Sequence, residues 1–275
     1  MPRPAIIVLL LLVALLPISL SAGESMRPLE WDLGIPAIPD KHGFAGAFAG
    51  TSKDHLLVAG GANFPDKPPW EDGKKVWHDR IFALPLAVEA GGAGEWVEAG
   101  RLPGPLAYGA SVSFAGRVIF LGGDDGRNAS DRVFGYSWGS GLEGPVDYPP
   151  LPSACTNHCA GLVPLKSGGA VIFVAGGLPE LEARSTAALK NFWSLALGPN
   201  GLPVDGGGWE TVAAWPGAER FQATSGVVDD QFYVIGGLRL DEGKRVMPPL
   251  SDGYRYSLSG KKWERIADLP ITTFR

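Results

Sequence analysis

Polar side chains that could bind a ligand recur at two kinds of position in this sequence. Tyr108, Arg220 and Gln222 follow proline-containing turns, whereas Asn63 and Arg239 follow pairs of glycines. A guanidinium donates paired hydrogen bonds to a carboxylate, so Arg220 is the candidate best suited to an anionic small molecule. Asn63 has an alternative role, because asparagine often caps a turn. If the fold brings both kinds of loop to one place, these five residues are predicted to bind substrate.

A second candidate cluster contains the two cysteines of the chain, Cys155 and Cys159, together with Asn157 and His158. An extended segment of this length spans about 13 Å, and a disulfide needs Cα atoms less than about 7 Å apart. A disulfide therefore requires a turn here. A metal ion would lack ligands at this spacing and is the least favoured interpretation. Two buried thiols and a loop disulfide both remain open.

The elements that must position these loops repeat four times. Each repeat contains a short apolar run that ends in paired glycines, and the second glycines are 62, 54 and 60 residues apart. A repeat of this length is typical of kelch propellers. Apolar runs without alternation predict strands that are buried on both faces. The runs are residues 56–61, 118–123, 172–177 and 232–237.

The rest of each repeat fits a four-stranded blade. An aromatic-rich segment follows each glycine pair, and Trp96, Trp209 and Trp263 mark a further strand, with Tyr148 near the corresponding place in the second repeat. A proline turn and a strand of small residues then open the next repeat. A Rossmann glycine turn is disfavoured, because amphipathic helices do not follow the glycines. We predict an all-β, kelch-type β-propeller with four blades in residues 23–275.

Composition and the first residues bear on partners and location. The net charge of −5 disfavours nucleic acid as a partner. Residues 1–22 combine Arg3, an apolar run over residues 5–16 and small residues at 19–22, as in a secretory signal. We therefore expect a secreted or periplasmic protein, with no membrane contact after signal cleavage. An uncleaved anchor is the alternative.

The two ends of the chain predict further blades. Residues 30–36 resemble a tryptophan strand and its proline turn, but no glycine-paired strand precedes them. The chain also ends five residues after Pro270, where a new repeat would begin. We expect an incomplete C-terminus and six blades in the full protein, closed by the Trp31 strand. A closed ring of four blades is the alternative, and it would leave Trp31 surplus.

Several stretches resemble the cyclically permuted mutarotase family, of the N-acetylneuraminate epimerase type. They are residues 43–50, 60–66, 70–79, 105–109 and 215–224. The resemblance implies a six-bladed kelch propeller that interconverts the anomers of sialic acid, a small carboxylated sugar, without a metal or organic cofactor. Opening and reclosing the sugar ring needs a base for the anomeric hydroxyl and an acid for the ring oxygen. Arg220 would then bind the sugar carboxylate.

The catalytic residues are not assigned by this resemblance. The family's glutamate and arginine, six positions apart, lie in a last permuted blade, beyond residue 275. Residues 180–184 contain a similar Glu and Arg at a different spacing, which we interpret as coincidence. Trp77, His78 and Asp79 are family-like but are expected to be structural. The main alternative function is a binding module without catalysis. A kelch-type copper oxidase is disfavoured, because its tyrosine, histidine and cysteine constellation is not recognisable.

Overall fold

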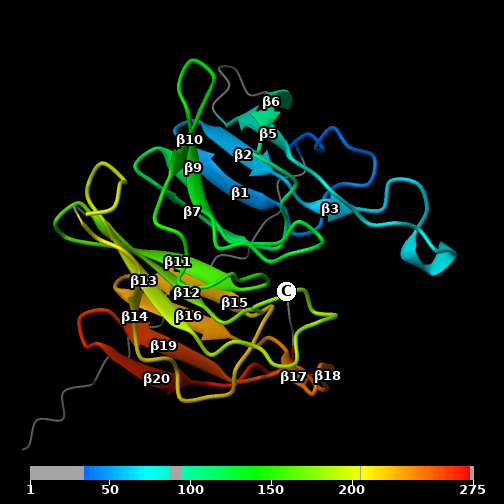
Figure 1. Cartoon of the computed structure of the whole chain (residues 1–275). Helices are drawn as coiled ribbons and strands as arrows, with labels where there is room; N and C mark the ends of the chain where they lie inside the picture. The colour runs from blue at the N-terminus through cyan, green and yellow to red at the C-terminus, as the bar shows by residue number, and fades with distance from the viewer. Residues whose placement is uncertain (1–33, 87–93, 205, 273–275) are drawn as a thin grey trace, which may run out of the picture. The chain divides into compact units, whose positions relative to one another are not determined.

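The computed structural model describes residues 34–86, 94–204 and 206–272. In these ranges the regular structure consists of β-strands and one short 3₁₀ helix, η1 (Pro69–Glu71). Sixteen strands form four antiparallel sheets of four, and in each sheet the strands pair in chain order. We call these sheets blades 1 to 4, from blue to red in Figure 1. The predicted all-β fold with four four-stranded blades is confirmed.

The strands of the blades have the following bounds. Blades 1 and 2 contain β1 (Phe48–Ser52), β2 (His55–Ala59), β5 (Arg80–Pro85), β6 (Val97–Arg101), β7 (Ala110–Phe114), β8 (Arg117–Leu121), β9 (Val133–Trp138) and β10 (Leu142–Asp147). Blades 3 and 4 contain β11 (Cys159–Pro164), β12 (Ala170–Ala175), β13 (Phe192–Leu197), β14 (Glu210–Thr211), β15 (Thr224–Val228), β16 (Gln231–Ile235), β19 (Gly253–Ser257) and β20 (Lys262–Ile266). Two short hairpins follow glycine pairs: β3 (Ala62–Asn63) with β4 (Val76–Trp77), and β17 (Arg239–Asp241) with β18 (Lys244–Val246).

The paired glycines connect each blade to the turn before the next one. Gly123 has a φ of 104°, and its N–H donates to the carbonyl of Cys155 at 2.8 Å. A Cβ on Gly122 would lie 2.5 Å from that same oxygen, so a side chain cannot be accommodated there. The apolar run and its glycines therefore have separate roles: the run fills the blade, and the glycines allow the next blade to approach.

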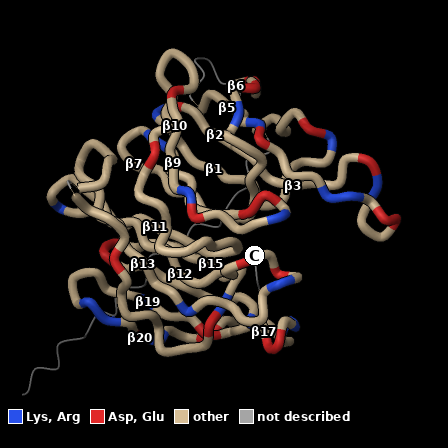
Figure 2. The backbone as a smooth tube through the Cα atoms, in the orientation of Figure 1, with Lys and Arg blue, Asp and Glu red and all other residues tan. Residues whose placement is uncertain are grey.

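The first strands of successive blades pack side by side. Contacts join β1 to β7, β7 to β11 and β11 to β15. The hydroxyl of Ser111 donates to the carbonyl of Ala49 at 2.7 Å, and Ser225 donates to Ala160 at 2.8 Å. Strands β1, β11, β12 and β15 carry no Lys, Arg, Asp or Glu, as the tan tube shows (Figure 2). Residues of β11 and β12 are mostly buried or half-buried between neighbouring blades, whereas alternate residues of β1 and β15 are exposed.

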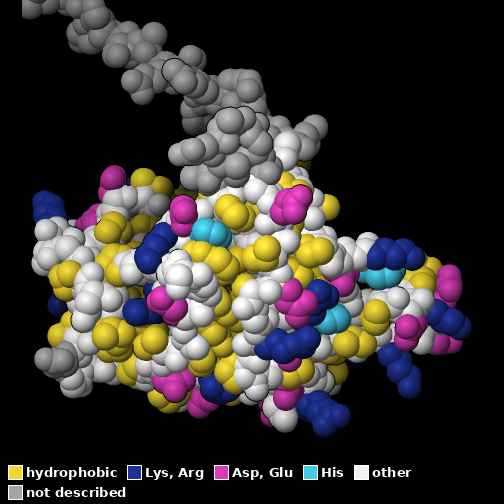
Figure 3. Space-filling view, turned by 90° about the horizontal axis from the view of Figure 1, so that it is seen from above, with side chains coloured by type: hydrophobic (Ala, Val, Ile, Leu, Met, Phe, Trp, Pro, Cys, Tyr) yellow, Lys and Arg dark blue, Asp and Glu magenta, His cyan; other side chains and the backbone are white. Residues whose placement is uncertain are grey.

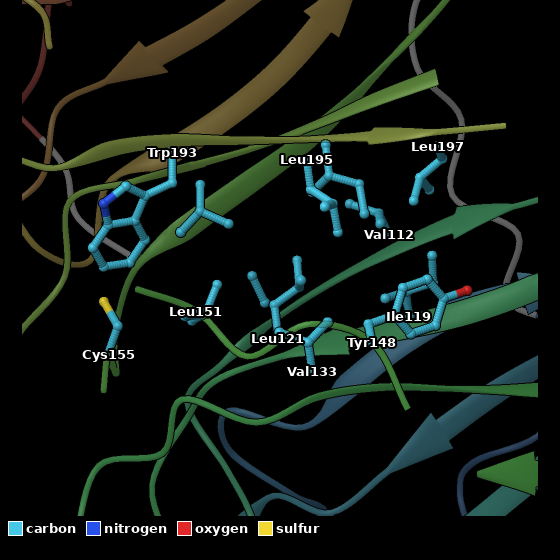
Figure 4. Close-up of a cluster of buried hydrophobic side chains, with 13 residues drawn as sticks. Val112, Ile119, Leu121, Val133, Tyr148, Leu151, Cys155, Trp193, Leu195 and Leu197 are labelled. Carbon is cyan, nitrogen blue, oxygen red and sulfur yellow. The ribbon is translucent and has the colours of Figure 1, made fainter. Parts of the chain in front are cut away.

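A continuous apolar core fills the space between blades 2 and 3. Ile119 and Leu121 of β8 and Leu195 and Leu197 of β13 are among its buried members (Figure 4). Cys155 belongs to the same cluster. Burying a large aliphatic side chain of this kind contributes about 1.5–3 kcal/mol, so this interface is a major source of stability.

Each tryptophan that marked a fourth strand hydrogen-bonds to the preceding repeat. The indole nitrogen of Trp209 donates to the carbonyl of Pro149 at 2.9 Å, and Trp263 donates to Ala213 at 2.7 Å. Trp96 donates in the same way to Pro36 at 2.8 Å. The segment around Pro36 thus accepts the tryptophan hydrogen bond of blade 1, just as the end of blade 2 accepts that of blade 3. Trp31 and residues 1–22 lie outside the described residues.

Tyr148 of blade 2 does not occupy the tryptophan position: its N–H donates to Val133, as that of Val212 donates to Phe192, so it corresponds to Val212 of blade 3. The Tyr148 hydroxyl donates to the carbonyl of Gly201 at 2.7 Å and accepts a hydrogen bond from Arg117 at 3.2 Å. Burial raises the pKa of this phenol. The structure also settles the state of the cysteines: Cys155 and Cys159 are both free and buried, and burial raises the pKa of Cys155. Within the described ranges, no helix is long and apolar enough to span a membrane.

Candidate functional site

One residue before each blade has the same unusual backbone conformation. These residues, which we call the axial residues, are Gly46, Tyr108, Asn157 and Gln222, with φ between 50° and 64°. The N–H of Tyr108 donates to the carbonyl of Gly46 at 2.8 Å, Asn157 to Tyr108 at 2.7 Å, and Gln222 to Asn157 at 2.8 Å. This chain of hydrogen bonds runs across all four blades and brings their polar side chains together.

Three cavities meet at the axial residues. The axial cavity, about 210 Å³, is lined by Ala45, Gly46, Tyr108, Asn157, His158 and Gln222. The funnel cavity, about 330 Å³, adds Lys75, Trp77, Asp124, Glu182 and Arg245 around Tyr108, Asn157 and Gln222. The outer cavity, about 620 Å³, is lined by Asn63, Lys67, Lys75, Tyr108 and neighbouring residues. Tyr108 lines all three, so we take these connected cavities as the candidate site.

Glycine at the first axial position makes room for Tyr108. A Cβ on Gly46 would lie 2.5 Å from Cδ1 of the tyrosine ring. The ring therefore lies directly over the Gly46 backbone. The half-buried aromatic ring lines all three cavities, where it can pack against an apolar part of a small molecule. The predicted ligand residues Tyr108 and Gln222 are brought together here.

Lys75 is a cation of this site that the sequence interpretation did not single out. Its Nζ lies 4.3 Å from the ring centroid of Tyr108 and 5.0 Å from that of Trp77. Such cation–π contacts hold an ammonium group beside aromatic faces. Lys75 lines both the outer and the funnel cavity. It lies within a stretch that resembled the mutarotase family, which was the available signal for it.

Asp124 is a buried acid in the wall of the funnel cavity. Its carboxylate accepts hydrogen bonds from the indole of Trp77 at 2.9 Å, the hydroxyl of Thr156 at 2.6 Å and the N–H of Gly126 at 3.1 Å. Burial raises the pKa of Asp124, while these three donors and the nearby charge of Lys75 oppose the shift. Asp124 was not predicted as a site residue.

Comparison of the four repeats shows that an acid is exceptional at this position. Asp124 follows its glycine pair directly and bridges to Ala107. The residues at the equivalent bridges are Ala62, Leu178 and Leu238, all buried and apolar. An acid among apolar equivalents is unfavourable for packing alone. Comparing the four residues that follow the glycine pairs would have identified it from sequence.

Arg220 is not a ligand-binding residue in this structure, which corrects the sequence prediction. Its side chain is completely buried, with 0% exposure, and its Nη2 donates to both carboxylate oxygens of Asp252 at 3.0 Å. It also donates to the carbonyls of Gly236 and Ala218. The positions two residues before Gly46, Tyr108 and Asn157 hold Phe44, Leu106 and Cys155; Phe44 is half-buried, and the other two are buried. Arg220 therefore joins blades 3 and 4, and its guanidinium does not face the cavities.

Of the other two predicted residues, Asn63 shares the outer cavity with Tyr108, whereas Arg239 lines none of the three cavities. Asn63 lines the outer cavity, but it is buried and donates to the carbonyl of Gly43 at 2.9 Å and to Asp40 at 3.2 Å. The ring of His78 hydrogen-bonds to its carbonyl oxygen at 2.8 Å, and burial lowers the pKa of that histidine. Asn63 thus holds a loop, as in the turn-capping alternative. Arg239 pairs with Val246 in a hairpin and lines none of the three cavities.

The segment that we had interpreted as coincidental lies over the funnel cavity. Glu182 lines this cavity and forms a bidentate ion pair with Arg245 of β18. That carboxylate raises the pKa of Arg245. Glu180 pairs with Arg184 at 3.2 Å, and Gly243 donates to the carbonyl of Thr186 at 3.0 Å. A loop of blade 3 and a hairpin of blade 4 thus form one side of the cavity.

The residues around the cysteines do not form a metal centre. In the parts of the chain that the structure describes, no group of three His, Cys, Asp or Glu side chains is suited to hold a metal ion. The thiols donate weak hydrogen bonds to backbone carbonyls, Cys155 to Gly176 and Cys159 to Ala175. His158 is buried and contributes to the wall of the axial cavity.

The repeated blades, glycine pairs and converging loops define a kelch-type β-propeller protein. A kelch motif model matches residues 219–270, which include blade 4. The N-acetylneuraminate epimerase family model matches residues 29–142. The predicted resemblance to this family is therefore confirmed over that segment.

Curated relatives give the same result. The N-acetylneuraminate epimerase of Yersinia enterocolitica serotype O:8 is 41% identical over 113 residues, covering 37% of this chain and 26% of the relative. Those of Yersinia pestis strain Pestoides F and Haemophilus influenzae strain PittEE are each 36% identical, covering 41% of this chain and 31% and 32% of their own lengths. The chain thus spans about a quarter to a third of these relatives.

A solved structure of YjhT resembles a larger part of the chain. It has a TM-score of 0.65 and covers 87% of this chain and 75% of its own, at 11% sequence identity. Similarity at this level of identity supports the propeller fold alone.

Proposed function

We propose that this chain is an exported sugar mutarotase that interconverts the α and β anomers of N-acetylneuraminate. The observation that carries the proposal is where the epimerase similarity falls. The matched segment, residues 29–142, contributes Lys75, Trp77, Tyr108 and Asp124 to the connected cavities. The similarity therefore includes part of the candidate site as well as part of the scaffold, whereas Asn157, Glu182 and Gln222 lie beyond the matched segment.

The cavities are suited to a small carboxylated sugar. Their combined space at Tyr108 is concave and lined by a few polar groups among aromatic and aliphatic side chains, as is usual for small-molecule sites. Tyr108 offers a ring face, and Asn157 and Gln222 offer amide groups that hydrogen-bond to hydroxyls. No organic cofactor is required, because mutarotation only breaks and remakes the bond between the anomeric carbon and the ring oxygen.

Proton transfer in this reaction needs a group that is accessible from the cavity. A base removes the proton of the anomeric hydroxyl, the ring C–O bond breaks as the carbonyl forms, and an acid protonates the ring oxygen. Reclosure on the other face reverses these transfers. Among the described acids of the funnel cavity, Asp124 is buried and bound by three donors, whereas the Glu182 side chain is 31% exposed. Glu182, which is ion-paired with Arg245 and is the more accessible of these two acids, is our candidate for proton transfer.

The test is direct measurement of anomer exchange. Saturation transfer between the NMR signals of the two anomers should be faster with the chain than in buffer. Removing a general acid or base typically lowers the rate by about 10²–10⁴-fold, so Glu182→Gln should abolish most of the added exchange while retaining binding. Glu180→Gln, at the neighbouring ion pair, is the matched control. Binding without any exchange would instead identify a sugar-binding module.

Export is the second part of the proposal. It is supported by Arg3, the apolar run over residues 5–16 and the small residues before position 23. Mass spectrometry of protein from an exporting host should find a mature N-terminus between Ala22 and Met26. A full-length chain in the cytosol would contradict export.

A further inference from the structure

We infer that Lys75 is the residue that binds the carboxylate of the sugar and so selects acidic sugars over neutral ones. This inference rests on the proposed function, because it assigns a specificity-determining residue within the same site. The need for one arises directly from the structure. Arg220, the residue expected in that role, is buried and fully engaged with Asp252 and backbone carbonyls.

Three other cations must be weighed against Lys75. Arg245 lines the funnel cavity, but its guanidinium is held by Glu182. Arg239 lines none of the three cavities. Lys67 lines only the outer cavity and belongs to the loop that projects between β3 and β4, at the right of Figures 1 and 3. Lys75 borders both the outer and the funnel cavity at Tyr108.

The ammonium of Lys75 is held beside two aromatic rings and near the carboxylate of Asp124, whose pKa its charge acts to lower. It lies beside the rings of Tyr108 and Trp77, and it has no hydrogen bond or ion pair with any residue that the structure describes. Aromatic faces position a cation while leaving its N–H donors available for an anion. A carboxylate at this position would gain charge-assisted hydrogen bonds. The sugar ring to which it is attached would lie against Tyr108.

Asp124 acts as a positioning residue for this arrangement. Its carboxylate accepts hydrogen bonds from the Trp77 indole at 2.9 Å and from the Thr156 hydroxyl at 2.6 Å. Asp124 thus holds the indole of the blade 1 hairpin against the loop that precedes blade 3. Fixing the indole fixes one of the two faces that hold Lys75. This role accounts for a buried acid at a place where the other repeats have Ala62, Leu178 and Leu238.

The experiment compares two ligands that differ in charge and by one methyl group: N-acetylneuraminate and its methyl ester. Binding is measured by calorimetry or NMR titration with the whole chain and with Lys75→Met. A hydrogen bond to a charged group contributes enough that its loss should weaken binding of the acid by about 10- to 100-fold. Binding of the ester should change less than about threefold, because the ester does not need the ammonium.

Matched variants separate charge from structure. Lys74→Met removes a neighbouring charge that lines none of the three cavities, and it should leave the preference for the acid intact. Lys75→Arg retains the positive charge and should restore most of it. Trp77→Phe keeps an aromatic face but cannot donate to Asp124, so it should weaken acid binding by a smaller factor, about 3- to 10-fold. Added salt should weaken binding of the acid and not of the ester in the unmodified chain.

The outcomes distinguish the two proposals. If Lys75→Met weakens binding of both ligands equally, or of neither, Lys75 does not bind the carboxylate. The inference is then wrong, while the proposed function stands. If the unmodified chain binds neither ligand, the proposed function fails and this inference fails with it. Should Lys75→Met not fold, the salt dependence of the two ligands decides the question, since equal dependence for acid and ester would exclude a carboxylate contact.

Discussion

Replacing Arg220 with alanine should mainly destabilise the fold. The substitution leaves the Asp252 carboxylate, whose side chain is only 17% exposed, without its bidentate partner. The carbonyls of Gly236 and Ala218 also lose a donor, and the rings of Trp215 and Tyr254 lose a packing partner 5.4 and 5.5 Å away. Breaking a buried ion pair on one side typically costs about 3–5 kcal/mol.

A change of this size is easily measured by urea unfolding. With a slope of about 3 kcal/mol per molar urea, the midpoint should fall by at least about 1 M. The matched control is Arg101→Ala, because Arg101 is 60% exposed and pairs with Asp79 and Glu98 on the surface. Exposed pairs contribute about 0–1 kcal/mol. Equal midpoints for the two variants, or a loss of sugar binding by a folded Arg220→Ala protein at unchanged stability, would refute the assignment of Arg220 to the blade interface.

Three further predictions concern the cavity wall and the core. Burial raises the pKa of Asp124 in the folded state, so the protonated carboxyl favours folding. This contribution to stability is complete at a pH below the ordinary pKa of 3.8 and is lost as the pH rises through the raised pKa of the folded state. The free energy of unfolding of the unmodified chain should therefore fall relative to that of Asp124→Asn across this window; a pH-independent difference in urea titrations would contradict it. Gly46→Ala should displace the Tyr108 ring and weaken sugar binding, as seen by NMR titration, whereas Gly104→Ala, where a Cβ meets nothing within 4 Å, should not. Tyr148→Phe should lower the free energy of unfolding by about 1–3 kcal/mol, because it leaves buried partners unsatisfied at Gly201 and Arg117; an unchanged urea midpoint would count against this.

The blades could be predicted from sequence because each depends on local signals. The run of Val118 to Leu121, its glycines and the following aromatic strand form one blade from contiguous residues, and the same order recurs four times. Trp209 and Trp263 could be recognised because tryptophan recurs at this place in the repeat. The structure explains the recurrence, since each indole makes the same hydrogen bond to the preceding repeat. Comparison of the four repeats with one another was therefore enough to predict the strands of the blades.

The site was predicted less well because it is assembled between repeats. Trp77, Asp124 and Thr156 come from three different repeats and are joined by hydrogen bonds. No regular spacing in the sequence predicts these bonds. Arg220 was misassigned for a related reason. Its place after a proline turn suggests exposure, but the carboxylate of Asp252, 32 residues later, makes a buried position favourable for it. The convergence of Tyr108 and Gln222 could be predicted because they occupy equivalent positions in their repeats.

The hydrogen-bonded chain through Gly46, Tyr108, Asn157 and Gln222 separates the shape of the cavity wall from its chemistry. Each link uses only backbone atoms, so the main chain keeps its course whatever side chain is attached. Substitution is limited mainly by the positive φ, which excludes β-branched residues and favours glycine and polar side chains such as asparagine. A propeller of this kind can therefore change the ligand-binding group of one blade while it keeps the backbone chain, but the first position is restricted to glycine here, because a Cβ on Gly46 would lie 2.5 Å from the Tyr108 ring. Gly, Tyr, Asn and Gln are then one combination of the few residue types that this backbone conformation favours. Related propellers with other residues at the axial positions would have a different cavity lining on the same backbone.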